Sequence, residues 1–188
     1  MPIENGKTKF KDIEWDVHPM VGVMGTCPEE GKVGCGYAFE LGGNMDSAKI
    51  TAGSTVYFPV EVEGALLQMG DIHASMGDGE VTGTGIEIQG DIMVRVSVIK
   101  NFELHWPVVE TSDAWYVIAA NQRMEPAFRK ACYELRRLVA AAYDWDYTDV
   151  ALYVTMQGLM EVNQACLDDD FQSVRMGVPK IPQKPGLI

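Results

Sequence analysis

The residues of this sequence best suited to chemistry are Asp71 and His73, which stand two positions apart near the start of the segment from Gly70 to Glu80. Side chains two positions apart on a β-strand project from the same face, so a carboxylate oxygen and an imidazole nitrogen can reach one metal ion. A hard or borderline divalent ion such as Zn²⁺ suits this mixture of carboxylate and imidazole ligands. A soft metal would instead prefer thiolate ligands. Two ligands do not make a site. The open choices for a third are Glu87, Asp78, Glu80 and Asp46.

The same residues also have a purely structural interpretation. His73 can be a hydrogen-bonded histidine at the end of a sheet, with the aspartates beside glycines serving as turn residues. His18 and His105 stand beside a proline and a tryptophan, where packing is more common than ligation. Ser75 near His73 suggests a catalytic triad, but a triad needs its members assembled in space. Cys27 is more readily a loop thiol without an activating partner than a nucleophile.

Composition limits the class of protein. The chain has 188 residues and a formal net charge of −12, with 15 Lys and Arg against 27 Asp and Glu. Such a field repels phosphate backbones and anionic headgroups, so we expect no nucleic-acid or membrane partner. No window approaches the roughly 18 apolar residues of a membrane span. The charged N-terminus and four scattered cysteines predict a cytoplasmic protein with free thiols.

Hydrophobic periodicity divides the chain into a β-rich part over 17–120, a helical part over 125–158, and a C-terminal strand and tail over 159–188, which we expect to form one domain over 1–188. The predicted strands are Val21–Met24, Thr55–Val60, Ala65–Met69, Glu80–Ile88, Ile92–Ile99, Pro107–Glu110, Trp115–Ala120 and Phe171–Val178. Thr55–Val60 is apolar on both sides, which predicts a place between two layers.

Two helices are expected after Asn121. The first begins near Pro126 and carries an apolar stripe at steps of three and four residues, and the second runs from Thr148 as N-cap to about Gln157. The fold class is therefore α+β and β-rich, with mostly antiparallel sheets packed as a sandwich or barrel-like core. One long and one short helix lie in its C-terminal third.

An ordered set of short motifs resembles the acetamidase/formamidase family over most of Val17 to Lys180. The stretches are HPMVGVMG from His18, GGNMD from Gly42, GSTVYFPV from Gly53, EGAL from Glu63, GDIHASMGDGEV from Gly70 and GIE from Gly85. Their common order and spacing are far more specific than any one of them.

The resemblance implies metal-assisted hydrolysis of a short amide, such as formamide or acetamide, to a carboxylate and ammonia. In that scheme Asp71, His73 and Glu87 hold a divalent metal, and Zn²⁺ is the expected ion. Asp78 or Glu80 moves the proton from water to the leaving nitrogen. Asn44 and Asp46 bind the amide or complete the ligand set, beside glycines that let the backbone come close to the substrate.

The resemblance implies a further segment before the stretch that begins here at His18, since members of the family usually carry roughly one hundred more residues there, about the size of a small domain. In this sequence Met1 precedes that stretch by 17 residues. We therefore expect either a homo-oligomer or completion by a second chain that carries this family segment. The alternative function is a non-catalytic β-sandwich subunit or small-ligand binding module that keeps the amidase fold. A thiol enzyme using Cys27 ranks last.

Overall fold

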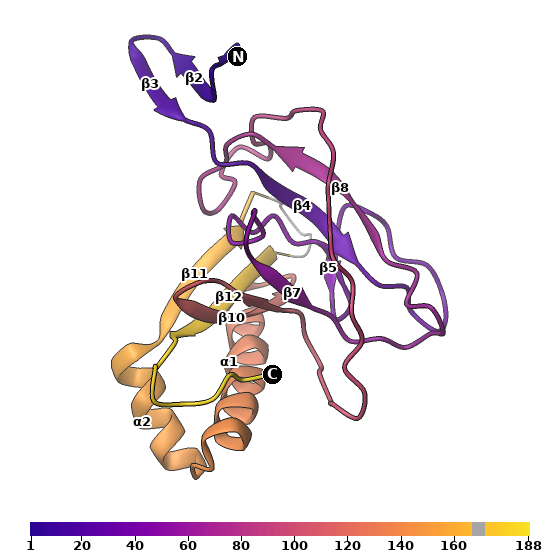
Figure 1. Ribbon diagram of the computed structural model, residues 1–188, viewed down its shortest axis with the longest axis vertical. Helices are drawn as coiled ribbons and strands as arrows, with labels where there is room; N and C mark the ends of the chain where they lie inside the picture. Colours follow the sequence, from indigo (N-terminus) through magenta and orange to yellow (C-terminus); the bar gives the residue numbers. More distant parts are fainter. Residues whose placement is uncertain (167–171) are drawn as a thin grey trace.

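The computed structural model describes residues 1–166 and 172–188 and arranges its strands in three sheets (Figure 1). The first sheet is formed by β1 (Ile3–Glu4), β2 (Lys7–Phe10) and β3 (Ile13–Asp16) and stands out from the rest of the molecule at the N-terminal end. The sequence analysis did not predict these strands, because their charged residues mask the alternation that marks a half-buried strand.

The second sheet positions the residues singled out for chemistry. Its strands are β4 (Met20–Gly25), β5 (Ala38–Phe39), β6 (Gly42–Asn44) and β8 (Gln68–His73), in the order β5-β6-β4-β8. β4 pairs antiparallel with both β6 and β8, and Met20 at its start lies opposite His73 at the end of β8. Asp71 and His73 therefore share a strand, as predicted.

The third sheet has the order β11-β12-β10-β9-β7 and its ladders are antiparallel. Its strands are β7 (Thr55–Tyr57), β9 (Val108–Glu110), β10 (Ala114–Asn121), β11 (Leu159–Gln164) and β12 (Gln172–Pro179). β10 is buried along all but its last residue, because α1 (Met124–Tyr143) packs on it from one side and it also contacts β5. The predicted α+β fold with mostly antiparallel sheets is confirmed.

Both predicted helices are present. α1 buries the stripe Ala131, Leu135, Leu138 and Val139 against the third sheet, as its spacing predicts. α2 (Tyr147–Gln157) follows directly. Its N-cap is Asp146, whose carboxylate accepts hydrogen bonds from the backbone N–H groups of the second and third helical residues. The prediction of Thr148 as the N-cap was therefore wrong. In the described part of the chain, no helix has the length and apolar character of a membrane span.

Several strand predictions were wrong in extent or in kind. Glu80–Ile88 forms no strand and makes one isolated bridge, from Glu87 to His73. Ile92–Ile99 forms no strand although its sequence alternates. The predicted strand Ala65–Met69 begins only at Gln68. Thr55–Val60 shortens to β7, which lies at the edge of its sheet. Alternation reports a capacity to pair, and pairing also needs a neighbouring strand. Phe171, predicted to begin a strand, lies outside the described residues.

Candidate metal and amide site

His73 is buried, and its Nε2 faces carboxylates from three parts of the chain. The side chain is 1% exposed, and Nε2 lies 3.4 Å from Asp71 Oδ1, 3.2 Å from Glu87 Oε1 and 4.0 Å from Asp46 Oδ1. Asp71 comes from the same strand, and Glu87 reaches the site through an isolated antiparallel bridge with His73. The three residues expected from the sequence, Asp71, His73 and Glu87, therefore lie together, with ligand atoms within 4.8 Å of one another.

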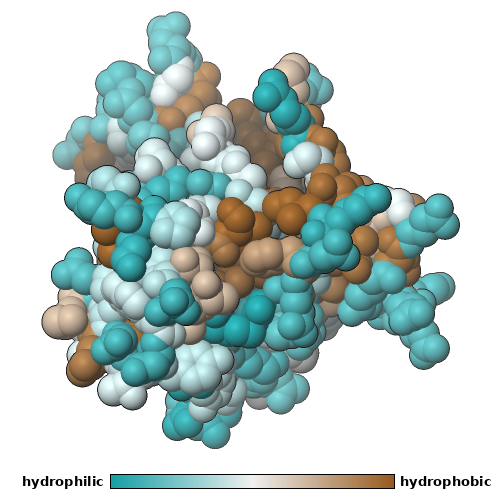
Figure 2. Space-filling view, turned by 60° about the horizontal axis from the view of Figure 1, so that its bottom comes forward, coloured by the Kyte–Doolittle hydropathy of each residue, from teal (hydrophilic) through white to brown (hydrophobic). Residues whose placement is uncertain are grey.

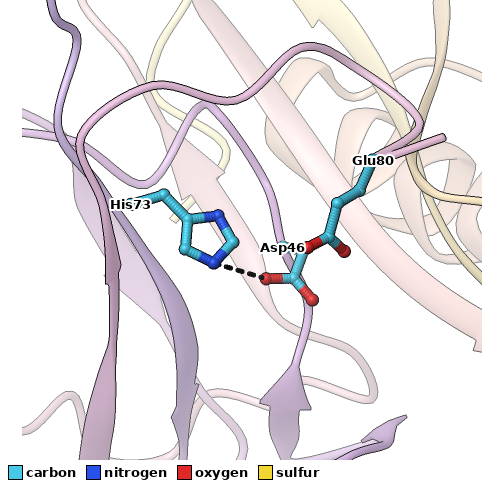
Figure 3. Close-up of side chains that lie close together, drawn as sticks. All are labelled: Asp46, His73 and Glu80. Atoms are coloured by element: carbon cyan, nitrogen blue, oxygen red, sulfur yellow. Dashed lines mark ion pairs between the residues drawn. The ribbon is translucent and has the colours of Figure 1, made fainter. Parts of the chain in front are cut away.

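A second acidic pair lies deeper beside the same imidazole. Asp46 follows β6, Glu80 follows the glycine-rich turn after β8, and both are buried (Figure 3). Ligand atoms of Asp46, His73 and Glu80 also lie within 4.8 Å of one another. The two groups share one histidine, so His73 lies between an inner and an outer pair of carboxylates.

Gln164 holds the inner pair together, and sequence analysis did not find it. From the end of β11, its Nε2 donates to Asp46 Oδ2 at 2.7 Å and to Glu80 Oε2 at 2.8 Å. One amide group thus uses both of its hydrogens on two carboxylates. Asp46 Oδ1 is buried without a hydrogen-bond partner among the described residues. No local motif announces Gln164, because its partner Asp46 lies 118 positions away in the chain.

The backbone at three of the acidic residues is left-handed. The φ angles are +43° at Asp46, +62° at Asp71 and +41° at Glu80. Such a conformation costs a residue other than glycine roughly 1–3 kcal/mol and often occurs at functional sites. The strain aims short acidic side chains where regular strand geometry would not place them.

Two glycines leave the space that the site occupies. A Cβ built on Gly22 in β4 would lie 2.4 Å from Asp46 Oδ1 and 2.6 Å from Asp71 Oδ2. A Cβ on Gly85 would lie 2.6 Å from His73 Nδ1. Neither position accepts a side chain without displacing the charged groups, so the glycines are part of how the carboxylates converge.

The electrostatics of the site call for a cation. Burial, followed by the negative charges of Glu80 and Asp71, raises the pKa of Asp46 to about 7. Four carboxylate side chains thus gather around a single imidazole. Among the described residues, no Lys or Arg pairs with any of the four.

The two ring nitrogens of His73 face different partners. Nδ1 lies 3.3 Å from the sulfur of Met76, which is only a weak hydrogen-bond acceptor, whereas Nε2 faces the carboxylates of Asp71 and Glu87. The donor set, the unpaired Asp46 oxygen and the gap kept by Gly22 fit a divalent ion with oxygen and nitrogen ligands.

Two of the residues expected to act here lie elsewhere. Asp78 Oδ2 accepts a hydrogen bond from Arg175 Nη2 at 2.6 Å, so this carboxylate is paired. Arg175 itself is buried and also binds Glu161. Asn44 belongs to neither acidic group of the described residues, and its Nδ2 lies 3.5 Å from the carbonyl of Gly36.

Ser75 and His105, the weaker candidates for catalysis, make structural contacts away from His73. Ser75 Oγ accepts a hydrogen bond from the indole of Trp15 at 3.0 Å and is not hydrogen-bonded to His73. His105 binds Glu134 and Glu103, far along the chain from the site. These contacts give no support to a triad.

An open cleft of about 700 Å³ borders the outer pair of carboxylates. It runs between β8 and the segment 87–92, and both Asp71 and Glu87 line it. The exposed sides of these two carboxylates therefore face a space large enough for a small ligand, whereas Asp46 and Glu80 lie beneath.

Comparison with known proteins places this geometry in a family. The sequence profile of the Acetamidase/Formamidase family matches residues 36–159, which is more than half of the chain. The chain belongs to this family. The matched stretch contains all four carboxylates, together with His73.

Solved relatives share the fold of this family member. A predicted acetamidase/formamidase from Thermoanaerobacter tengcongensis is 38% identical with a TM-score of 0.90, covering 94% of this chain and 58% of its own. An acetamidase from Bacillus halodurans is 30% identical with a TM-score of 0.89, covering 95% and 60%. A formamidase from Methylophilus methylotrophus is 51% identical over 61 residues, 32% of this chain and 15% of its own. The chain thus spans about three fifths of the solved relatives.

Proposed function

We propose that this protein hydrolyses short linear amides, such as formamide or acetamide, at a metal site centred on His73. The observation that carries the proposal is the convergence of Asp46, Asp71 and Glu87 on Nε2 of one buried histidine. Relatives named formamidase and acetamidase support the substrate class. Zn²⁺ is the ion we propose, because it accepts carboxylate and imidazole ligands together.

His73, Asp71 and Glu87 are the proposed ligands, and Asp46 is placed to complete the set through its unpaired Oδ1. A divalent cation held there supplies Lewis acidity toward an amide carbonyl and lowers the pKa of a neighbouring water. Asp71 and Glu87 line the cleft, so they define the side from which the substrate enters.

Glu80 is the proposed proton carrier. Gln164 donates a hydrogen bond to Oε2 of Glu80. The Glu80 carboxylate lies within 4.8 Å of ligand atoms of His73 and Asp46. In the reaction, water adds to the amide carbon, Glu80 takes a proton from it and passes one to the nitrogen, and the C–N bond breaks. The products are ammonia and a carboxylate. We place Asp78 second for this role because Arg175 already binds it.

The test measures ammonia release from formamide and acetamide after chelation, with and without added Zn²⁺. His73→Ala should lose both turnover and bound metal. The matched control is His18→Ala, which changes an exposed histidine outside both acidic groups of the described residues. Activity that survives in His73→Ala would remove the histidine from the mechanism.

A second function is favoured by the share of the relatives that this chain covers. A binding subunit that keeps the site but leaves turnover to a larger assembly is consistent with a match to 58% of a solved chain. Stoichiometric metal binding that depends on His73, without ammonia release by the chain alone, would identify this function.

A further inference from the structure

The segment Ile92–Ile99 has the sequence of a strand and the exposure of an unprotected surface. The exposed fractions are 98% for Met93, 77% for Val98, 69% for Val96 and 53% for Ile99. Figure 1 shows the chain after the loop that follows β8 running as a long extended trace, and the segment joins none of the strands. Figure 2 shows hydrophobic areas between hydrophilic side chains on one face of the molecule.

Such a segment is costly to leave open. Extended backbone with β-branched side chains offers a row of N–H and C=O groups that template pairing with another strand. Proteins usually blunt exposed strands with charges, prolines or bulges. Here Arg95 is the only charged residue between Ile92 and Ile99, and the segment has no proline. Exposure of these apolar side chains to water is therefore unfavourable, and a partner strand could cover them while pairing with the backbone.

We propose that Ile92–Ile99 pairs with a β-strand from the portion of the family's polypeptide that lies outside the stretch matched by this chain. In the two solved relatives, the matched part superposes with TM-scores of 0.90 and 0.89 but is only 58% and 60% of the chain. About two fifths of each relative therefore lies outside the matched part. Ile92–Ile99 offers that portion a ladder without a partner among the described residues.

The surface is continuous with the proposed catalytic site. The cleft of about 700 Å³ is lined by Asp71 and Glu87 and also by Ile92, the first residue of the segment. A strand seated along Ile92–Ile99 would wall this cleft and reduce the exposure of Glu87, which is now 53%. The partner thus both covers apolar surface and encloses the outer carboxylates.

The experiment needs neither metal nor substrate, so its outcome is independent of amide hydrolysis. The chain is co-expressed with a tagged polypeptide comprising the part of the Thermoanaerobacter tengcongensis relative outside the match. Native mass is measured by light scattering, and hydrogen exchange is followed at the backbone amides of Ile92–Ile99. We expect a one-to-one complex in which these amides become protected.

Val96→Lys should weaken the complex by about tenfold or more, because the ammonium group would be buried against an apolar strand. Val98→Lys tests the same surface independently. Val81→Lys is the matched control, since Val81 is 79% exposed and lies outside the segment. Three results overturn the proposal: no complex, a complex indifferent to both lysines, or a dimer of the chain that excludes the added polypeptide. The last would assign the surface to a second copy.

Discussion

At the scale of single residues, the candidate site depends on the absence of a side chain at Gly22, which leaves room for two carboxylates. A Cβ at this position would lie 2.4 Å from Asp46 Oδ1 and 2.6 Å from Asp71 Oδ2. Gly70, on the neighbouring strand β8, has no atom within 4 Å of an added Cβ. The two glycines therefore form a matched pair that separates backbone effects from crowding of the carboxylates.

We expect Gly22→Ala to weaken Zn²⁺ binding by at least about tenfold, because a displaced carboxylate no longer meets His73 with the required geometry. Gly70→Ala should bind the ion as the unchanged protein does. Isothermal titration of the chelated proteins measures both. Equal affinities in the two variants would mean that the space beside Gly22 has no part in the site.

Gln164 makes the complementary contribution, since it supplies the hydrogens that two buried carboxylates share. Gln164→Leu replaces the amide with an apolar side chain of comparable size. The substitution leaves Asp46 Oδ2 and Glu80 Oε2 without their hydrogen-bond donor. We expect it to lower the free energy of unfolding by about 1–3 kcal/mol. The control is Gln157→Leu at the exposed end of α2. Urea titration followed by circular dichroism would contradict the prediction if both variants unfolded alike.

At the scale of elements, the end of the segment that leads into β9 is tied to α1 by one ionisable pair. His105 donates its backbone N–H to Glu134 Oε1, and its Nδ1 lies 2.9 Å from Glu134 Oε2. The hydrogen bond with Glu134 raises the pKa of His105 above its ordinary value. Burial alone would raise the pKa of Glu134, but bonds from Arg137 and His105 leave it lowered.

The raised histidine pKa gives the pair a pH dependence with a defined sign. Its stabilisation is complete below the unfolded pKa of about 6.5 and is lost as the pH rises through the higher folded value. His105→Gln should therefore destabilise the protein more at pH 5.5 than at pH 9. The difference should be at most about 1 kcal/mol, because the imidazole is half exposed.

Thermal unfolding at the two pH values measures this difference. His18→Gln is the control variant, because His18 is exposed and forms no ion pair among the described residues. A loss for His105→Gln that is larger at pH 9 would reverse the assigned sign and exclude the pair as its cause.

The elements also show which parts of the molecule sequence reasoning reaches. α1 was predictable because its apolar stripe and its partners within the helix are local. Asp71 and His73 were predictable as neighbours because they stand two positions apart on one strand, but the left-handed φ of +62° at Asp71 was not. Ile92–Ile99 alternates as strictly as a real strand, yet strand formation depends on a partner that the pattern does not contain. Gln164 escaped notice for the same reason, since its role exists only once β11 lies beside the loop carrying Glu80.

At the scale of the whole molecule, the site joins parts of the chain that are far apart in sequence. Asp46 follows a strand of the second sheet, Gln164 ends a strand of the third, and Glu80 lies in the loop between them. Anything that relieves repulsion among these side chains should therefore stabilise the packing of one sheet against the other. The protein's net charge of −12 makes a bound cation more favourable still.

This link predicts that Zn²⁺ at one hundred times its dissociation constant raises the free energy of unfolding by about 2.7 kcal/mol. For a chain of this size the midpoint of thermal unfolding should rise by about 5–10 °C. Differential scanning calorimetry after chelation and after adding Zn²⁺ back measures the shift. His18→Ala should show the same rise and His73→Ala none, because only the second removes a nitrogen that faces the carboxylates. If the ion left the midpoint unchanged while binding elsewhere on the acidic surface, the four carboxylates around His73 would not form a metal site.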